Sequence, residues 1–177
     1  VMLATSKPAA DGETTLAERL ESAGAAMHSQ SWTDAVGAYE QALQLDPSSP
    51  EILNALSAAR REASASDALG ECETQLSAAR RLHSGTDARA AIAAYESALG
   101  CFETVDAETH AGPQAASRLA GDVVPAVVAL HRAHGAEALG RGDFDTALQS
   151  LRTAARLFEQ TQAAAEPTSR DELTSEL

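Results

Sequence analysis

Three segments of this chain repeat one pattern of small and large apolar residues at a spacing of 56 residues. They run from Trp32 to Leu45, from Ala88 to Cys101 and from Phe144 to Leu157. In the first segment, alanines at 35 and 42 flank the larger Val36 and Tyr39, and the other two segments follow it column by column. These positions share one face of an α-helix, where small residues let a neighbouring helix approach and large residues fill the groove. Three matches at a fixed interval indicate a fold built by repetition.

A second helical stretch precedes each repeated segment, so the pattern predicts antiparallel helical hairpins. The first stretch is Leu16 to Ser29, which follows the capping box Thr15-x-x-Glu18. The third is Ala126 to Leu139, where the preceding Pro125 suits a first helical turn. The middle hairpin is expected to turn at Ser84-Gly85-Thr86.

Two stretches carry recognisable motifs: Trp32-x-x-Ala35-x-x-x-Tyr39-x-x-Ala42-Leu43 closing at Asp46-Pro47, and Gly135 through Ala147. They resemble the tetratricopeptide repeat (TPR) family, whose helix pairs of about 34 residues have small and aromatic residues at set places. The resemblance covers roughly 15–47, 71–103 and 127–160, and the small residue of the first helix is Ala23, Ala79 and Gly135 in turn. The later repeats depart from the family pattern, since they lack the proline and the third has Leu151 in place of the aromatic.

The interval between repeats exceeds the family's by about 22 residues, which is enough for another helix. The first insert has Ile52 to about Glu62 as one helix, and Ser64-x-x-Asp67 looks like a new cap before Leu69 to Leu82. An alternative layout fuses 50–84 into one long helix, against which only Gly70 and the capping signals argue.

The second insert contains Gln114 to Ala120, with a break expected at Gly121-Asp122. With both inserts counted, the sequence predicts an all-α, TPR-like α-solenoid of antiparallel hairpins with about eight helices, over residues 15–162. Residues 1–14 are expected to be a flexible N-terminal arm, and 163–177 an acidic polar C-terminal tail.

The charge balance limits the partners. A formal net charge of −13 with pI ≈ 4.7 argues against nucleic acid and anionic membrane surfaces, which attract Lys and Arg. No apolar run approaches the roughly 20 residues that a membrane-spanning helix needs. Other protein subunits, through basic surfaces or helices, remain the expected partners.

The two cysteines predict a compartment. Cys72 and Cys101 are too few for a disulfide scaffold and have no Cys-x-x-Cys spacing. We expect buried free thiols, with a reactive pair as the alternative, in a reducing intracellular compartment. Cytoplasm and an organelle matrix or stroma are not distinguished. Because Val1 opens the chain without a charged-then-apolar leader, a processed or trimmed product is expected.

Motifs for catalysis are missing from the sequence. It has neither a phosphate-binding P-loop nor a Gly-x-Ser-x-Gly nucleophile motif. His131-x-x-His134 with Glu137 lies on one helical face and has metal-ligand spacing, but a structural site needs three or four ligands, so ordinary polar side chains are the expected interpretation. The sequence therefore predicts no enzyme, no cofactor and no metal.

The resemblance implies a concave surface, lined by the first helices, that binds other proteins. Carried onto this sequence, its lining is Leu20, Gly24, Met27, His28, Leu76, Arg80, His83, Arg132, Ala136 and Leu139. The leucines and Met27 would give apolar contact, while Arg80 and Arg132 would meet carboxylates. As an alternative, the inserted helices cover much of this surface.

One specialisation of the family is not expected here. Co-chaperones that hold the C-terminal carboxylate of a heat-shock protein use Lys and Asn on successive first helices. None of the matching positions in this chain has either residue, and the sole lysine is Lys7.

Two functions remain. The chain is expected to be a scaffold or structural subunit within a larger complex, or alternatively an assembly factor or adaptor that binds a client transiently.

Overall fold

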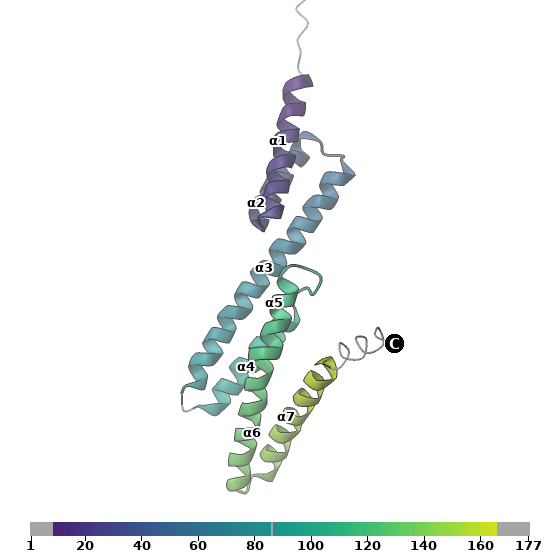
Figure 1. The fold of residues 1–177 in the computed structure, drawn as a ribbon. Coiled ribbons are helices and arrows are strands. Elements are labelled where there is room, and N and C mark those ends of the chain that lie inside the picture. Colours follow the sequence, from purple (N-terminus) through teal and green to yellow (C-terminus); the bar gives the residue numbers. More distant parts are fainter. Residues whose placement is uncertain (1–8, 86, 166–177) are drawn as a thin grey trace, which may run out of the picture. The chain divides into compact units, whose positions relative to one another are not determined.

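A computed structural model describes residues 9–85 and 87–165, and within these ranges it contains helices and no strand. The predicted all-α fold is therefore confirmed for the described chain. The elements are α1 (Ala9–His28), α2 (Trp32–Leu45), α3 (Pro50–His83), α4 (Ala88–Glu103), α5 (Ala111–Arg118), the π-helical segment η1 (Leu119–Val123), α6 (Val124–Gly140) and α7 (Phe144–Ala165). Figure 1 labels the helices α1 to α7.

The chain divides into two compact units, and the division falls inside α3 between Asp67 and Ala68. The first unit contains α1, α2 and the beginning of α3. The second contains the rest of α3 and the helices α4 to α7.

The first unit is built on the α1–α2 hairpin. Alanines at 23, 35 and 42 are completely buried, so the two helices approach closely over the small side chains predicted for this role. The turn between them passes through Gln30, whose φ of 60° is left-handed. Arg60 of α3 forms an ion pair with Glu40 of α2, with 2.7 Å between guanidinium nitrogen and carboxylate oxygen.

The second unit contains a matching hairpin of α6 and α7 (Figure 1). Its close approach requires Gly135, because a Cβ added there would lie 2.8 Å from Cγ of Leu151. On the facing side of α7, Ala147 and Ala154 are buried. The predicted columns of small residues therefore form the seam of this hairpin as well.

α3 is one continuous helix across residues 50–83, so the alternative layout is the one that the structure has. The predicted cap at Ser64-x-x-Asp67 starts no new helix, and Gly70 costs only about 1 kcal/mol relative to alanine inside a helix. The buried positions 52, 56 and 59 share one face, but 65, 69, 72, 76 and 79 share a rotated one. The apolar face therefore changes direction within α3, close to the point where the capping signals and Gly70 predicted a division.

The break predicted at Gly121-Asp122 is also absent. α5, η1 and α6 follow one another without interruption, and both residues lie in η1. In a regular α-helix, the ring of Pro125 would clash with the carbonyl group of residue 121 and interrupt the helix. A π-helical turn at this point lets the helical chain continue past the proline. We call α5, η1 and α6 together the α5–α6 rod.

The ends of the helical region differ from the expected ones. α1 begins at Ala9, inside the segment 1–14 expected to be an arm, because Ala9 and Ala10 have high helix propensity. α7 continues to Ala165, past the expected end near Gln162. Residues 1–8 and 166–177, where the rest of the arm and tail fall, lie outside the described residues.

Candidate functional site

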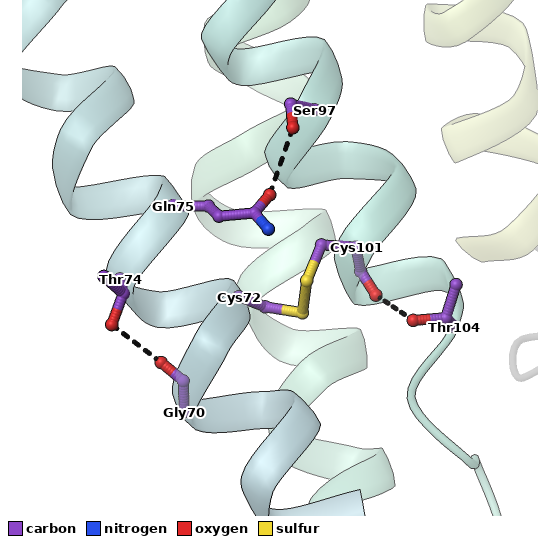
Figure 2. Close-up of a disulfide and its surroundings, with 7 residues drawn as sticks. All are labelled: Gly70, Cys72, Thr74, Gln75, Ser97, Cys101 and Thr104. Atoms are coloured by element: carbon purple, nitrogen blue, oxygen red, sulfur yellow. Dashed lines mark hydrogen bonds between the residues drawn. A yellow bond between two sulfur atoms is a disulfide. The ribbon is translucent and has the colours of Figure 1, made fainter.

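A disulfide joins Cys72 of α3 to Cys101 of α4 in the second unit (Figure 2). The expectation of free thiols is therefore wrong. The two residues are 29 positions apart in sequence, but the packing of α3 on α4 brings their Cα atoms to 5.4 Å, within the range for a disulfide. Beside it, the Ser97 hydroxyl donates a hydrogen bond to the Gln75 side chain at 3.1 Å. The disulfide lies in the second unit, which also contains α6 and α7.

A network of four charged side chains fastens α3 to the α5–α6 rod. Nε of Arg118 lies 2.7 Å from a carboxylate oxygen of Glu73, and its terminal nitrogen lies 3.0 Å from Asp122. Arg80 also contacts Asp122, at 3.1 Å. The hydrogen bonds to Glu73 and Asp122 raise the pKa of Arg118 above its ordinary value. Arg80 therefore meets a carboxylate of its own chain, whereas the sequence assigned it to a partner.

A polar hollow of about 380 Å³ lies among α4, α6 and α7. Within it, Nε2 of His131 lies 3.0 Å from a carboxylate oxygen of Glu96, and His131 is nine-tenths buried. The other ring nitrogen of His131, and Nδ1 of His134, are buried without a hydrogen-bond partner among the described residues. Glu137, the third member of the suspected metal set, pairs with Arg141. Within residues 9–85 and 87–165, no three potential ligands gather closely enough to hold a metal.

An apolar groove lies between α6 and α7. One part of about 320 Å³ and a second of about 310 Å³ share Val128, Arg132 and Phe158 as lining. The remaining lining is small and apolar: Ala120, Val124, Pro125, Ala129, Leu151, Ala154 and Ala155. Arg132 contributes the one charged side chain among these lining residues. We call this feature the α6–α7 groove.

The apolar lining continues along α7 toward its first residue. Exposed apolar side chains recur every three or four residues, which places them on one face of the helix. They are Phe144, Leu148, Leu151, Ala155 and Phe158, and the four large ones are between 38% and 70% exposed. We call this face the α7 strip. α7 therefore has two apolar faces, one buried against α6 and the other exposed.

The predicted partner-binding residues differ in their exposure and in their contacts within the chain. Leu76 is completely buried and therefore not open to a partner, and Arg80 is held by Asp122. His83 is exposed and meets Tyr95 edge to face, with 6.0 Å between ring centroids. On α1, Leu20, Gly24 and His28 are exposed and Met27 is half-buried.

Among the predicted partner-binding residues, those on α6 come nearest to describing the α6–α7 groove. Arg132 lines it, and Ala136 and Leu139 are exposed on the next turns of α6. The prediction missed Leu151 and Phe158, because the family resemblance directed attention to first helices only. It also missed Val128, which lies on the first helix of the third hairpin. The sequence contained a signal for Leu151 and Phe158, since α7 has more apolar residues than one buried face requires.

Comparisons with protein-family models, with curated proteins and with solved structures gave no match to this chain. The resemblance to the TPR family therefore stays a prediction. No helix in the described ranges has the length and apolar character needed to cross a membrane.

Proposed function

We propose that this chain is a non-enzymatic, TPR-like protein-interaction module that docks as a structural subunit within a larger complex, through the α6–α7 groove and the α7 strip. The observation that carries the proposal is the second apolar face of α7, where Leu148 is 49% and Leu151 38% exposed. Burying such side chains against a partner gains roughly 25 cal/mol for each Å² removed from water. Large contiguous apolar patches on proteins of this size mark interaction sites.

The shape of the site supports the same proposal. The groove is a shallow channel between two antiparallel helices with an almost entirely apolar lining. Such a channel suits an apolar face that lies along it, as in helix-in-groove recognition.

The test blocks the groove without disturbing the hairpin. Ala155 is exposed and lines the groove, so Ala155→Arg places a long cationic side chain there while Ala147 and Ala154 keep the α6–α7 seam. The matched control is Ala58→Arg, since Ala58 is an exposed alanine of α3 in the first unit. Circular dichroism should show the same helicity for both variants.

Each variant is used to recover partners from the native source, with quantitative mass spectrometry and size-exclusion chromatography of the recovered material. We expect a defined partner, recovered with the unchanged chain in a stable complex, to be lost with Ala155→Arg and kept with Ala58→Arg. Equal recovery with both variants would exclude the groove as the docking site. A complex that dissociates during chromatography would favour the transient adaptor.

A further inference from the structure

The α7 strip repeats a surface that is covered elsewhere in the same unit. At the 56-residue spacing, Leu148 corresponds to Ile92 of α4, and Leu151 corresponds to Tyr95. Ile92 is 8% and Tyr95 5% exposed, against 49% and 38% for their counterparts. The alanines on the seam side of both helices are buried alike. The two helices therefore agree on their alanine face and differ in the exposure of the large residues at these two positions.

On α4, the face that carries Ile92 and Tyr95 is buried in a unit whose other elements are helices. The α5–α6 rod packs along α4 through all three of its segments. The charged network of Glu73, Arg118 and Asp122 fastens the same rod to α3. A helix is thus the element that this architecture uses to close the groove between the two helices of a repeat, with apolar contact in the centre and ion pairs at the side.

One position in the α6–α7 groove differs in chemistry from its counterpart. Arg132 stands where the preceding repeat has the completely buried Leu76. Its guanidinium has no carboxylate partner among the described residues. A helix that covers the groove as the rod covers α4 would remove this cation from water, which is costly unless a carboxylate meets it.

We infer that the α6–α7 groove binds a single amphipathic helix of a partner protein, which lies along the α7 strip as the α5–α6 rod lies along α4 and brings a carboxylate to Arg132. This inference rests on the proposed function and specifies its partner. The strip from Phe144 to Phe158 is about 20 Å long, which matches a helix of about 14 residues. A second copy of the chain is a poorer occupant, because two chains with a net charge of −13 repel each other.

The inference is tested with a phage-displayed library of peptides about 18 residues long, in which leucine is fixed at helical spacing and the other positions are random. The library is selected on the immobilised full chain. We expect the enriched peptides to share one acidic position. Binding should weaken about 30-fold or more with Arg132→Glu, because this change leaves the peptide carboxylate without its partner. A peptide with lysine at that position should regain affinity for Arg132→Glu.

Controls separate this inference from the function that it specifies. Arg19→Glu makes the same charge change on an exposed residue of α1 and should leave the affinity unchanged. The enriched peptides could lose their affinity for Ala155→Arg and still bind Arg132→Glu as tightly as the unchanged chain. That result would overturn the carboxylate contact and leave the interaction function in place. A failure to enrich any helix would overturn the inferred occupant, whereas the function itself is decided by partner recovery. A dimer in sedimentation velocity that Ala155→Arg dissociates would assign the groove to a second copy.

Discussion

Ile92 of α4 and Leu148 of α7 occupy equivalent positions 56 residues apart, yet Ile92 is 8% exposed and Leu148 is 49% exposed. The local sequence around both is helical and rich in alanine, so the difference comes from what packs against each helix. The α5–α6 rod lies on α4, and the equivalent face of α7 is the one proposed to receive a partner.

This pair gives a matched stability prediction. Ile92→Ala should lower the free energy of unfolding by about 2–5 kcal/mol, because it leaves a cavity in a packed face. Leu148→Ala should change it by about 0.5 kcal/mol or less, as at other exposed positions. Urea denaturation followed by circular dichroism measures both. Equal losses would mean that the outer face of α7 is buried in the isolated chain.

Gly112, near the start of α5, lies against the backbone of Ala107. A Cβ added to Gly112 would lie 2.4 Å from the carbonyl oxygen of Ala107 and 2.7 Å from its carbonyl carbon, so the backbone itself must move. Gly112→Ala should therefore destabilise the protein by about 1–3 kcal/mol, the range for overpacked sites. The midpoint of thermal unfolding reports the change.

Gly70→Ala is the control for Gly112→Ala, and it also tests whether α3 is one continuous helix. Gly70 is exposed inside the helix, and a Cβ there would have no neighbour within 4 Å. Gly70→Ala should raise the stability by up to about 1 kcal/mol, through helix propensity alone. A loss of stability would argue that the chain bends at Gly70, as the layout with two helices requires.

The sequence predicted local periodicity well and long-range packing poorly. The columns of alanine around Ala35, Ala91 and Ala147 correctly gave the faces on which helices pair, because this signal depends only on positions three and four apart. The same signal cannot distinguish one helix with two differently directed faces from two helices, and α3 is such a helix. The prediction of a break at Gly121 failed for a similar reason, since a π-helical turn is not visible in apolar spacing.

The candidate site shows the same limit. Arg132 was predicted from its place on a first helix, and the structure puts it in the groove. Leu76 occupies the equivalent place on α3 and is completely buried, which its place on a first helix does not reveal. The pairing of Cys72 with Cys101 also depends on how α3 and α4 pack, which the spacing of the two cysteines does not reveal.

Asp143 gives the stability of the second unit a dependence on pH. Its carboxylate accepts a hydrogen bond at 3.2 Å from the backbone N–H of Thr146 at the start of α7. Hydrogen bonds from the Thr146 side chain and from this N–H lower the pKa of Asp143 below its ordinary value of 3.8. A lowered pKa in the folded state contributes stability above the ordinary value, and the contribution is lost as the pH falls through the folded-state value.

Asp143→Ala should therefore unfold at a lower temperature than the unchanged chain at neutral pH, because α7 loses its N-terminal cap. The difference should shrink as the pH falls below 3.8, where the carboxyl of the unchanged chain becomes protonated. Asp143→Asn is the control, since its amide oxygen still caps the helix but does not titrate. Differential scanning calorimetry across this range provides the measurement, and a difference that does not vary with pH would contradict the role of the charged carboxylate.

The Cys72–Cys101 disulfide predicts that oxidation state controls the stability of the second unit, and hence of the scaffold that carries the groove. It closes a loop across a sequence separation of 29. In the chain-entropy account, a loop of this size is worth about 3–4 kcal/mol, because the bond restricts the unfolded chain. The Cys72→Ala/Cys101→Ala double variant should lose about that amount in urea denaturation while keeping its helicity under native conditions. Adding a reductant should lower the stability of the unchanged chain but not that of the variant. If iodoacetamide modified both cysteines of the unfolded, unreduced chain, the two sulfur atoms would not be bonded and α4 would be held to α3 by noncovalent contacts alone.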